Sequence, residues 1–150
     1  MSFWNENFKK NKMKNILVLC TGNSCRSQMA HGYLSLFAEG KAKIYSAGIE
    51  THGLNKNAVS IMKDDDVDIS HHTSNNVSEY DAINFDVILT VCDHAHENCP
   101  FIPSKNAIRL HHNFTDPSKI NGTKEEIESA FLKTRNEIKA YSKGLIDSYI

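Results

Sequence analysis

The chain of 150 residues has few of the features that mark membrane, secreted or nucleic-acid-binding proteins. Its longest apolar run near the N-terminus, residues 16–20, is much shorter than the ~20 residues of a membrane span or the ~7–15 of a signal-peptide core. Lys and Arg number 17 against 18 Asp and Glu, so a net charge of −1 offers no broad basic surface. We therefore expect a cytoplasmic protein that binds neither nucleic acid nor a membrane.

Cysteine, proline and glycine are also scarce. The four cysteines, Cys20, Cys25, Cys92 and Cys99, are too few for a disulfide scaffold and, in a reducing compartment, are more often catalytic or metal-binding. Seven glycines and three prolines exclude a collagen-like or low-complexity chain. With 40% hydrophobic residues and the length of one domain, the composition predicts a single folded unit.

Apolar segments divide the chain into alternating strands and helices. Residues 1–13 are polar and are interpreted as an N-terminal extension of a domain that comprises residues 14–150. The continuous apolar run at 15–20 is typical of a strand buried on both faces of a parallel sheet. Further strands are expected at 44–47, 85–91 and 107–110, and helices around 30–37, around 58–62 and after a capping box of Thr123 and Glu126. This order predicts an α/β domain whose ligands lie at the carboxyl ends of parallel strands.

The loop after the first strand carries the residues that indicate chemistry, namely Cys20, Thr21, Gly22, Asn23, Ser24, Cys25, Arg26 and Ser27, and we call it the oxyanion loop. Backbone N–H groups in such a loop lie at the positive end of the helix dipole, where a tetrahedral oxyanion fits. We expect Gly22 and Asn23 to adopt left-handed backbone angles that curl the loop. The planar guanidinium of Arg26 suits two oxygens of phosphate or arsenate.

Cys20 is the candidate nucleophile. The surrounding N–H groups and the cation of Arg26 are expected to depress the pKa of Cys20, so that a thiolate is present at neutral pH. The alternative is a buried structural cysteine in a tight turn. Cys25 has no assigned step and is interpreted as a packing residue, although a disulfide with Cys20 stays open.

The loop sequence CTGNSCRS resembles the low-molecular-weight tyrosine phosphatase superfamily, whose pattern is Cys, five residues, Arg, Ser and a distant catalytic Asp-Pro, here Asp116-Pro117. The resemblance covers nearly the whole chain from about Lys14. It implies a single domain with a four-stranded parallel sheet flanked by helices on both faces. It also implies that Cys20 is the nucleophile, that Arg26 and the loop amides bind the oxyanion, and that Asp116 is the general acid. Asn23 and Ser27 would support the thiolate and the loop.

A second pair of cysteines points to one branch of this superfamily. Cys92 and Cys99 are six residues apart and Pro100 follows, an arrangement similar to the thioredoxin-coupled arsenate reductases, as are the segments CTGNSCRSQMA and YSAGIETHG. The resemblance implies that Cys20 attacks arsenate, that Cys92 then attacks the Cys20 sulfur and expels arsenite, and that Cys99 resolves the disulfide for reduction by thioredoxin. We expect a monomer without a cofactor or bound metal.

A low-molecular-weight protein tyrosine phosphatase, hydrolysing phosphomonoesters through a cysteinyl-phosphate intermediate, is the alternative function. Such phosphatases usually follow the catalytic Asp-Pro with aromatic residues, whereas Ser118 and Lys119 follow here. Gln28 also stands after the Arg-Ser pair, where a proline is common. These differences favour the reductase, but we still expect weak phosphatase activity because phosphate and arsenate share shape and charge.

Other interpretations of the same residues stay open. Cys92, His94, His96 and Cys99 could form a zinc cluster, although the six-residue gap exceeds the usual ~2–4-residue spacing. The oxyanion loop could also serve a binding or redox-sensing module without turnover. A potassium site near the loop is not expected, because His31 and Asn75 stand where potassium-binding members of the family have acidic side chains.

The spacing of Cys92 and Cys99 also predicts a conformational change. In a regular helix their Cα atoms would lie about 10 Å apart at ~1.5 Å per residue, whereas a disulfide needs less than ~7 Å. We therefore expect residues 92–103 to loosen or refold when the two sulfurs are joined.

Overall fold

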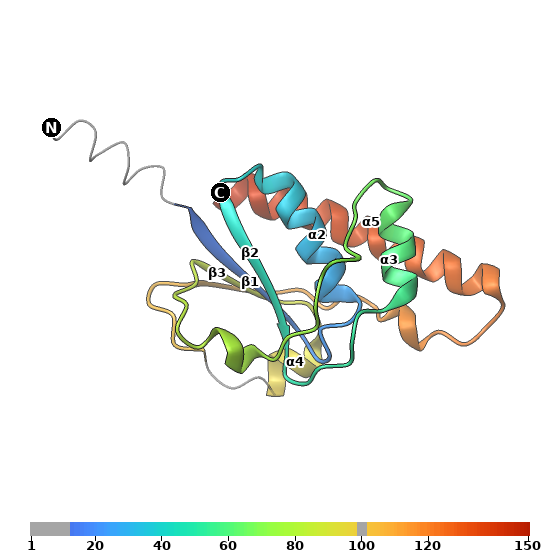
Figure 1. Ribbon diagram of the computed structural model, residues 1–150, viewed down its shortest axis with the longest axis horizontal. Coiled ribbons are helices and arrows are strands. Elements are labelled where there is room, and N and C mark those ends of the chain that lie inside the picture. Colours follow the sequence, from blue (N-terminus) through green and yellow to red (C-terminus); the bar gives the residue numbers. More distant parts are fainter. Residues whose placement is uncertain (1–12, 99–101) are drawn as a thin grey trace, which may run out of the picture.

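Four parallel strands in the order β2-β1-β3-β4 form the centre of the computed structural model, which describes residues 13–98 and 102–150 (Figure 1). The strands are β1 (Lys14–Cys20), β2 (Ala42–Gly48), β3 (Val87–Thr90) and β4 (Ile108–His111). β1 and β3 lie in the middle of the sheet, which is why their apolar residues form uninterrupted runs. The predicted four-stranded parallel sheet is confirmed.

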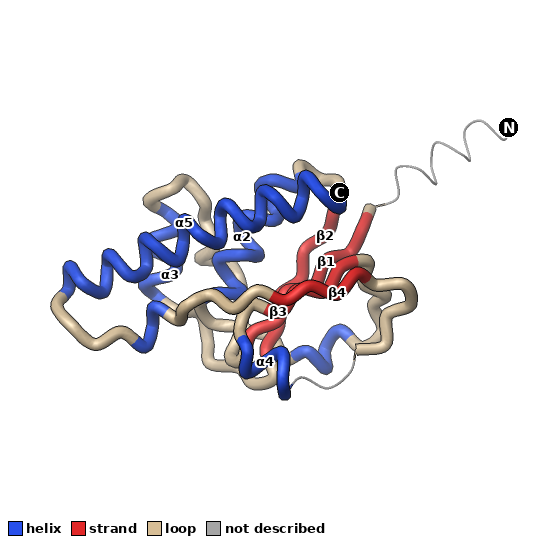
Figure 2. The backbone as a smooth tube through the Cα atoms, turned by 180° about the vertical axis from the view of Figure 1, so that it is seen from behind, coloured by secondary structure: helices blue, strands red, loops and turns tan. Residues whose placement is uncertain are grey.

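The helices lie mainly on one face of this sheet. They are α2 (Arg26–Ala38), α3 (Lys56–Lys63), α4 (Asp93–Asn98) and α5 (Lys124–Tyr149), with the short 3₁₀ helices η1 (Val77–Tyr80) and η2 (Pro117–Lys119). Figure 2 shows α2, α3 and α5 together on one side of the strands. Ile16 and Val18 of β1 pack against these helices, whereas Leu17 and Leu19 face the other side, where η1 and neighbouring loops cover the sheet.

Most element boundaries agree with the sequence prediction. The Thr123 hydroxyl accepts a hydrogen bond from the Glu126 N–H at 3.2 Å, and the Glu126 carboxylate accepts one from the Thr123 N–H, so the predicted capping box is present. α2 ends where Glu39 adopts a left-handed conformation with φ 48°. β3 is shorter than the predicted 85–91, because only Val87–Thr90 pair with neighbouring strands.

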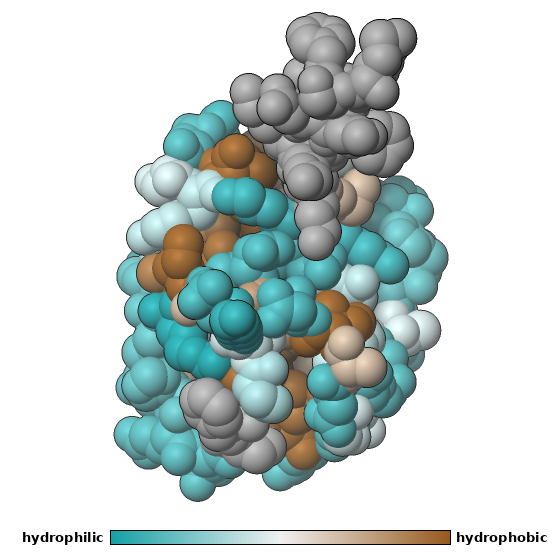
Figure 3. Space-filling view, turned by 90° about the vertical axis from the view of Figure 1, so that its left-hand side faces the viewer, coloured by the Kyte–Doolittle hydropathy of each residue, from teal (hydrophilic) through white to brown (hydrophobic). Residues whose placement is uncertain are grey.

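The surface shows few large apolar side chains. Those that are exposed in the described residues lie on different elements and do not adjoin in sequence: Met13, Leu36, Ile108, Ile120 and Leu132. On the face drawn in Figure 3, apolar residues form separate spots among hydrophilic ones. Within the described residues, no helix is both long and apolar enough to cross a membrane. Residues 1–12 of the predicted extension, and Cys99, lie outside the described residues.

Candidate active site

The oxyanion loop joins the end of β1 to the start of α2, at the edge of the sheet where the sequence predicted a ligand. The segment after β2 holds it in place, because the Glu50 N–H donates to the Thr21 carbonyl and the His52 N–H donates to the Gly22 carbonyl, both at 2.9 Å. The loop also packs directly on Gly48, where a Cβ would lie 2.6 Å from the Thr21 carbonyl oxygen. Glycine at the end of β2 is therefore required for this close approach.

Asn23 has the left-handed backbone predicted for it, with φ 48°, and its side chain is fully buried. Its amide donates to the Ser27 hydroxyl at 2.9 Å, and its side-chain oxygen accepts from the Asn75 N–H at 2.8 Å. The curl of the loop is therefore fixed by side-chain hydrogen bonds within the loop and to a distant segment.

The prediction for Gly22 is wrong, since Gly22 is not among the residues with positive φ. A Cβ on Gly22 would instead meet the ring of His52, whose side chain is half exposed. Sequence reasoning took the residue type as a sign of backbone conformation, whereas in the structure a side chain from another segment lies over this position.

Arg26 and Asp116 meet beside the loop, as the sequence predicted. One guanidinium nitrogen of Arg26, Nη1, donates to the Phe114 carbonyl at 2.8 Å, and Nη2 lies 3.5 Å from Asp116 Oδ2. The Asp116 carboxylate also accepts from the N–H and the hydroxyl of Ser118, at 3.0 and 2.6 Å. Both side chains are mostly buried, with 11% and 18% of their surface exposed. A cation and a carboxyl group are thus placed together at the mouth of the site.

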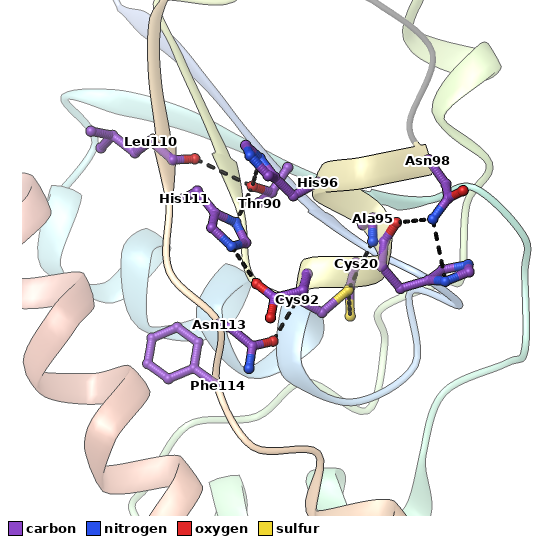
Figure 4. Close-up of polar contacts among 12 residues, drawn as sticks. Cys20, Thr90, Cys92, Ala95, His96, Asn98, Leu110, His111, Asn113 and Phe114 are labelled. Atoms are coloured by element: carbon purple, nitrogen blue, oxygen red, sulfur yellow. Dashed lines mark hydrogen bonds and ion pairs between the residues drawn. The ribbon is translucent and has the colours of Figure 1, made fainter.

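Cys20 and Cys92 form a close thiol pair. Their sulfur atoms are 3.5 Å apart, and both residues are buried, with 5% and 2% exposure (Figure 4). Cys92 lies just after β3, the neighbour of β1, and its sulfur also contacts the Thr21 hydroxyl and the Ala95 N–H at 3.4 Å. A disulfide bond of about 2.05 Å therefore requires an approach of only ~1.5 Å from the present geometry.

The pair changes the predicted ionisation of Cys20. The hydrogen bond from the Cys20 thiol lowers the pKa of Cys92 to about 5, with further help from Thr21, Ala95 and Arg26. The same hydrogen bond, together with burial, raises the pKa of Cys20 well above its ordinary value, although Arg26 acts to lower it. The expectation of a depressed pKa at Cys20 is therefore wrong for this arrangement. The two sulfurs share one proton, and the negative charge belongs to the pair.

A pocket of about 570 Å³ opens in front of this pair. Its lining comprises Cys20, Thr21, Gly22, Ser24, Cys25, Arg26, Glu50, His52, Cys92, Asp93, His94, Asn113, Asp116, Ser118 and Lys119. The pocket therefore brings together the oxyanion loop, the second thiol and the Asp-Pro segment. Among the described residues, no Phe, Tyr or Trp lines it, which agrees with the lack of an aromatic wall inferred from Ser118 and Lys119.

Cys25 and the histidines of α4, which the sequence analysis also singled out, do not take part in the thiol pair. Burial raises the pKa of Cys25 to about 12, so its thiol stays neutral, which favours a packing role. His94 and His96 are two positions apart in α4 and turn to different neighbours: His94 contacts Asn98, whereas His96 stacks on His111. The described members of the zinc cluster considered above therefore do not converge on one point.

Sequence reasoning missed the residues that support the oxyanion loop from behind. The Gln28 amide donates to the Asn23 and Thr73 carbonyls at 3.0 and 2.9 Å, and its oxygen lies 3.0 Å from His72 Nδ1. The Ser74 hydroxyl donates to the Gly22 carbonyl at 2.9 Å. Gln28 is part of the segment CTGNSCRSQMA noted in the sequence, but its side-chain type alone does not reveal these contacts.

Comparison with known proteins identifies the family of the chain. Residues 15–149 match the family described as low molecular weight phosphotyrosine protein phosphatase, and the chain belongs to this family.

Within the family, the similar curated proteins include the arsenate reductase of Halalkalibacterium halodurans (strain ATCC BAA-125), which is 46% identical over 125 residues, 83% of this chain and 89% of that protein. Arsenate reductase 1 of Staphylococcus epidermidis (strain ATCC 35984) is 46% identical over 127 residues, covering 85% and 91%. A solved structure, "An arsenate reductase in oxidized state", superposes with a TM-score of 0.79 at 26% identity, over 92% of this chain and 100% of that one.

Proposed function

We propose that this protein is an arsenate reductase that converts arsenate to arsenite through a relay of three thiols, Cys20, Cys92 and Cys99, which thioredoxin regenerates. The observation that carries the proposal is the pair of buried sulfurs 3.5 Å apart at an anion-binding loop. Hydrolysis of a phosphate ester needs one such thiol, whereas reduction of an oxyanion by two electrons needs a second sulfur within reach. The names of the relatives support the same activity.

The first step is the attack of Cys20 on arsenate held by the loop amides and Arg26. The thiol proton of Cys20 is directed at Cys92, which is therefore placed to accept it and pass it to solvent. The resulting thiolate forms a sulfur–arsenic bond. One arsenate oxygen leaves as water after Asp116, beside Arg26, donates a proton to it.

The second step transfers the electrons. The Cys92 thiolate attacks the Cys20 sulfur, and a Cys20–Cys92 disulfide forms while the sulfur–arsenic bond breaks. The electron pair of that bond stays on arsenic, so As(V) becomes As(III) and arsenite is released. The short distance between the two sulfurs means that this step requires no large movement of the backbone.

The third step restores Cys20. A thiolate at Cys99 attacks the Cys92 sulfur, forms a Cys92–Cys99 disulfide and releases the Cys20 thiolate. Two thiols of thioredoxin then reduce this disulfide and supply the two electrons consumed by arsenate. A relay that starts from reduced thiols suits the cytoplasm, where we propose that the protein acts.

Activity as a low-molecular-weight protein tyrosine phosphatase is the second candidate function. It is favoured by family membership and by the pair of Arg26 and Asp116, which both reactions would use. Hydrolysis of a phosphomonoester needs only one of the thiols, Cys20. The pocket offers no aromatic wall among the described residues, so we propose that phosphomonoester hydrolysis is a weak side activity.

The test measures arsenate-dependent NADPH oxidation with thioredoxin and thioredoxin reductase, beside aryl-phosphate hydrolysis. We expect Cys20→Ser to abolish both activities, whereas Cys92→Ser and Cys99→Ser abolish reduction and keep hydrolysis. Cys25→Ser is the matched control and retains reduction. Robust hydrolysis without arsenate turnover in the wild type would contradict the proposal and identify a phosphatase.

A further inference from the structure

Polar contacts join the short helix α4, which begins directly after Cys92, to the sheet. They involve two residues of the sheet and two of the helix. His111 at the end of β4 lies between two partners: its Nε2 is 2.7 Å from Asp93 Oδ1, and its Nδ1 is 2.7 Å from the Thr90 hydroxyl. The ring of His96, one turn along α4, stacks on the His111 ring with centroids 4.1 Å apart (Figure 4). We call Thr90, Asp93, His96 and His111 the α4 clamp.

An ionised Asp93 and a neutral His111 ring together give the hydrogen bonds of the α4 clamp one consistent direction. An ionised carboxylate only accepts, so His111 Nε2–H donates to Asp93. If the His111 ring is neutral, its Nδ1 is then an acceptor, and the Thr90 hydroxyl donates to it at 2.7 Å in preference to the Leu110 carbonyl, which lies 3.5 Å away. The Thr90 oxygen still has lone pairs directed at His96 Nδ1, 3.4 Å away. Thr90 is 8% exposed, so water competes little for its hydroxyl.

Cys92 lies between two members of the α4 clamp in the sequence. Thr90 precedes it by two residues and Asp93 follows it, so these side chains fix the backbone on both sides of the thiol. The Asp93 N–H is also held by the Asn113 side chain at 3.0 Å. With the start of α4 fixed in this way, the Ala95 N–H is directed at the Cys92 sulfur.

We propose that the α4 clamp seats the start of α4 so that the Cys92 sulfur faces that of Cys20, which makes Thr90 and His111 positioning residues for the thiol pair. This inference deepens the proposed function, because Cys92 is the second thiol of the relay. Its test, however, uses the reduced protein in the absence of arsenate, so that its outcome does not depend on whether the protein reduces arsenate.

The test follows the pH dependence of Cys92 alkylation by iodoacetamide, measured on the Cys92 peptide by mass spectrometry. Thr90→Val keeps the shape of the side chain and removes the hydroxyl, whereas Thr90→Ser keeps the hydroxyl and removes a methyl group. We expect Thr90→Val to raise the apparent pKa of Cys92 by about one unit or more, because the hydrogen bond from Cys20 is weakened. Thr90→Ser is expected to match the wild type.

A second variant tests the proposal if Thr90→Val does not fold. His111→Phe retains an aromatic ring to stack on His96 but removes the hydrogen bonds of His111 to Asp93 and Thr90. We expect it to raise the apparent pKa of Cys92 by the same amount. His112→Gln, on the adjacent residue packed against Phe114 and Tyr141, is the control and leaves the Cys92 profile unchanged. Equal shifts in Thr90→Val and Thr90→Ser would show a packing role alone, and no shift in the folded Thr90 and His111 variants would also overturn the proposal.

Discussion

At the scale of single residues, the paired burial of Cys20 and Cys92 governs the charge of the site. Each thiol alone would be hard to ionise in such a buried position, but together they hold one negative charge by sharing a proton. The hydrogen bond between the two sulfurs favours the thiolate form of Cys92 and the thiol form of Cys20. Cys20 becomes a nucleophile when its proton moves to Cys92, whose sulfur lies 3.5 Å from that of Cys20.

A partly buried pair of histidines, His31 and His72, lies behind the oxyanion loop and makes stability depend on pH. Burial lowers the pKa of His31 to about 3 and that of His72 to about 4, and the two rings stack with centroids 4.2 Å apart. An unfolded histidine binds a proton below about pH 6.5, whereas these folded ones stay neutral, so stability falls as pH drops below 6.5.

We expect His31→Gln to lose less stability than the wild type between pH 7 and pH 5, by about 2 kcal/mol of unfolding free energy. His31 Nδ1 lies 2.8 Å from the Ser46 hydroxyl, and glutamine can keep a hydrogen bond to it. Urea titrations at the two pH values provide the measurement. His112→Gln, at an exposed position packed on Phe114 and Tyr141, serves as the control; an equal pH dependence in the wild type and His31→Gln would refute the assignment.

The sequence was sufficient to identify most of the residues at the site, because Cys20, Arg26 and Asp116 carry their chemistry in their spacing and residue type. The sequence wrongly predicted a lowered pKa for Cys20, because the pKa values of both thiols depend on the short distance between Cys20 and Cys92, which the sequence does not reveal. It also missed Gln28, whose role depends on which carbonyl groups lie nearby.

At the scale of elements, α4 is the part of the fold that the proposed relay would disturb. It fills the interval between Cys92 and Cys99 with helix from Asp93 to Asn98. If the helix ran through both cysteines, their Cα atoms would lie about 10 Å apart, beyond the ~7 Å that a disulfide allows. We therefore expect a Cys92–Cys99 disulfide to disrupt α4.

We expect the backbone amides of Asp93–Asn98 to exchange with deuterium faster after oxidation to the Cys92–Cys99 disulfide than in the reduced protein. The measurement is hydrogen–deuterium exchange followed by mass spectrometry on both redox states. Helix α3, Lys56–Lys63, lies outside the relay and is the internal control with unchanged exchange. Equally slow exchange of α4 in both states would show that the helix survives oxidation.

Elements with strong local signals were predicted well. The capping box of Thr123 and Glu126 and the apolar spacing that follows specify α5, and the continuous apolar run specifies β1. The ends of β3 were less predictable, because pairing with β1 and β4 decides where the strand stops. Val67 and Ile69 are buried although they lie in a loop, so apolar residues there do not mark a strand.

At the scale of the whole molecule, the sheet order brings together segments that are far apart in the chain. β1 and β3 are parallel neighbours (Figure 1), with Leu19 opposite Thr90. Their carboxyl ends therefore place Cys20 and Cys92 together at one edge of the sheet. The sequence predicted that both cysteines follow strands, but only the strand order makes them neighbours. The candidate site is therefore a product of topology as well as of its motif.

The most direct test of the relay is to map disulfides after one equivalent of arsenate is added to fully reduced Cys99→Ser protein. Without the resolving thiol, we predict that a Cys20–Cys92 disulfide accumulates and that one arsenite appears for each disulfide formed. Rapid acid quenching, alkylation and peptide mass spectrometry provide the readout. Unreduced arsenate with both thiols still free, or a disulfide between Cys20 and Cys25 instead, would contradict the account.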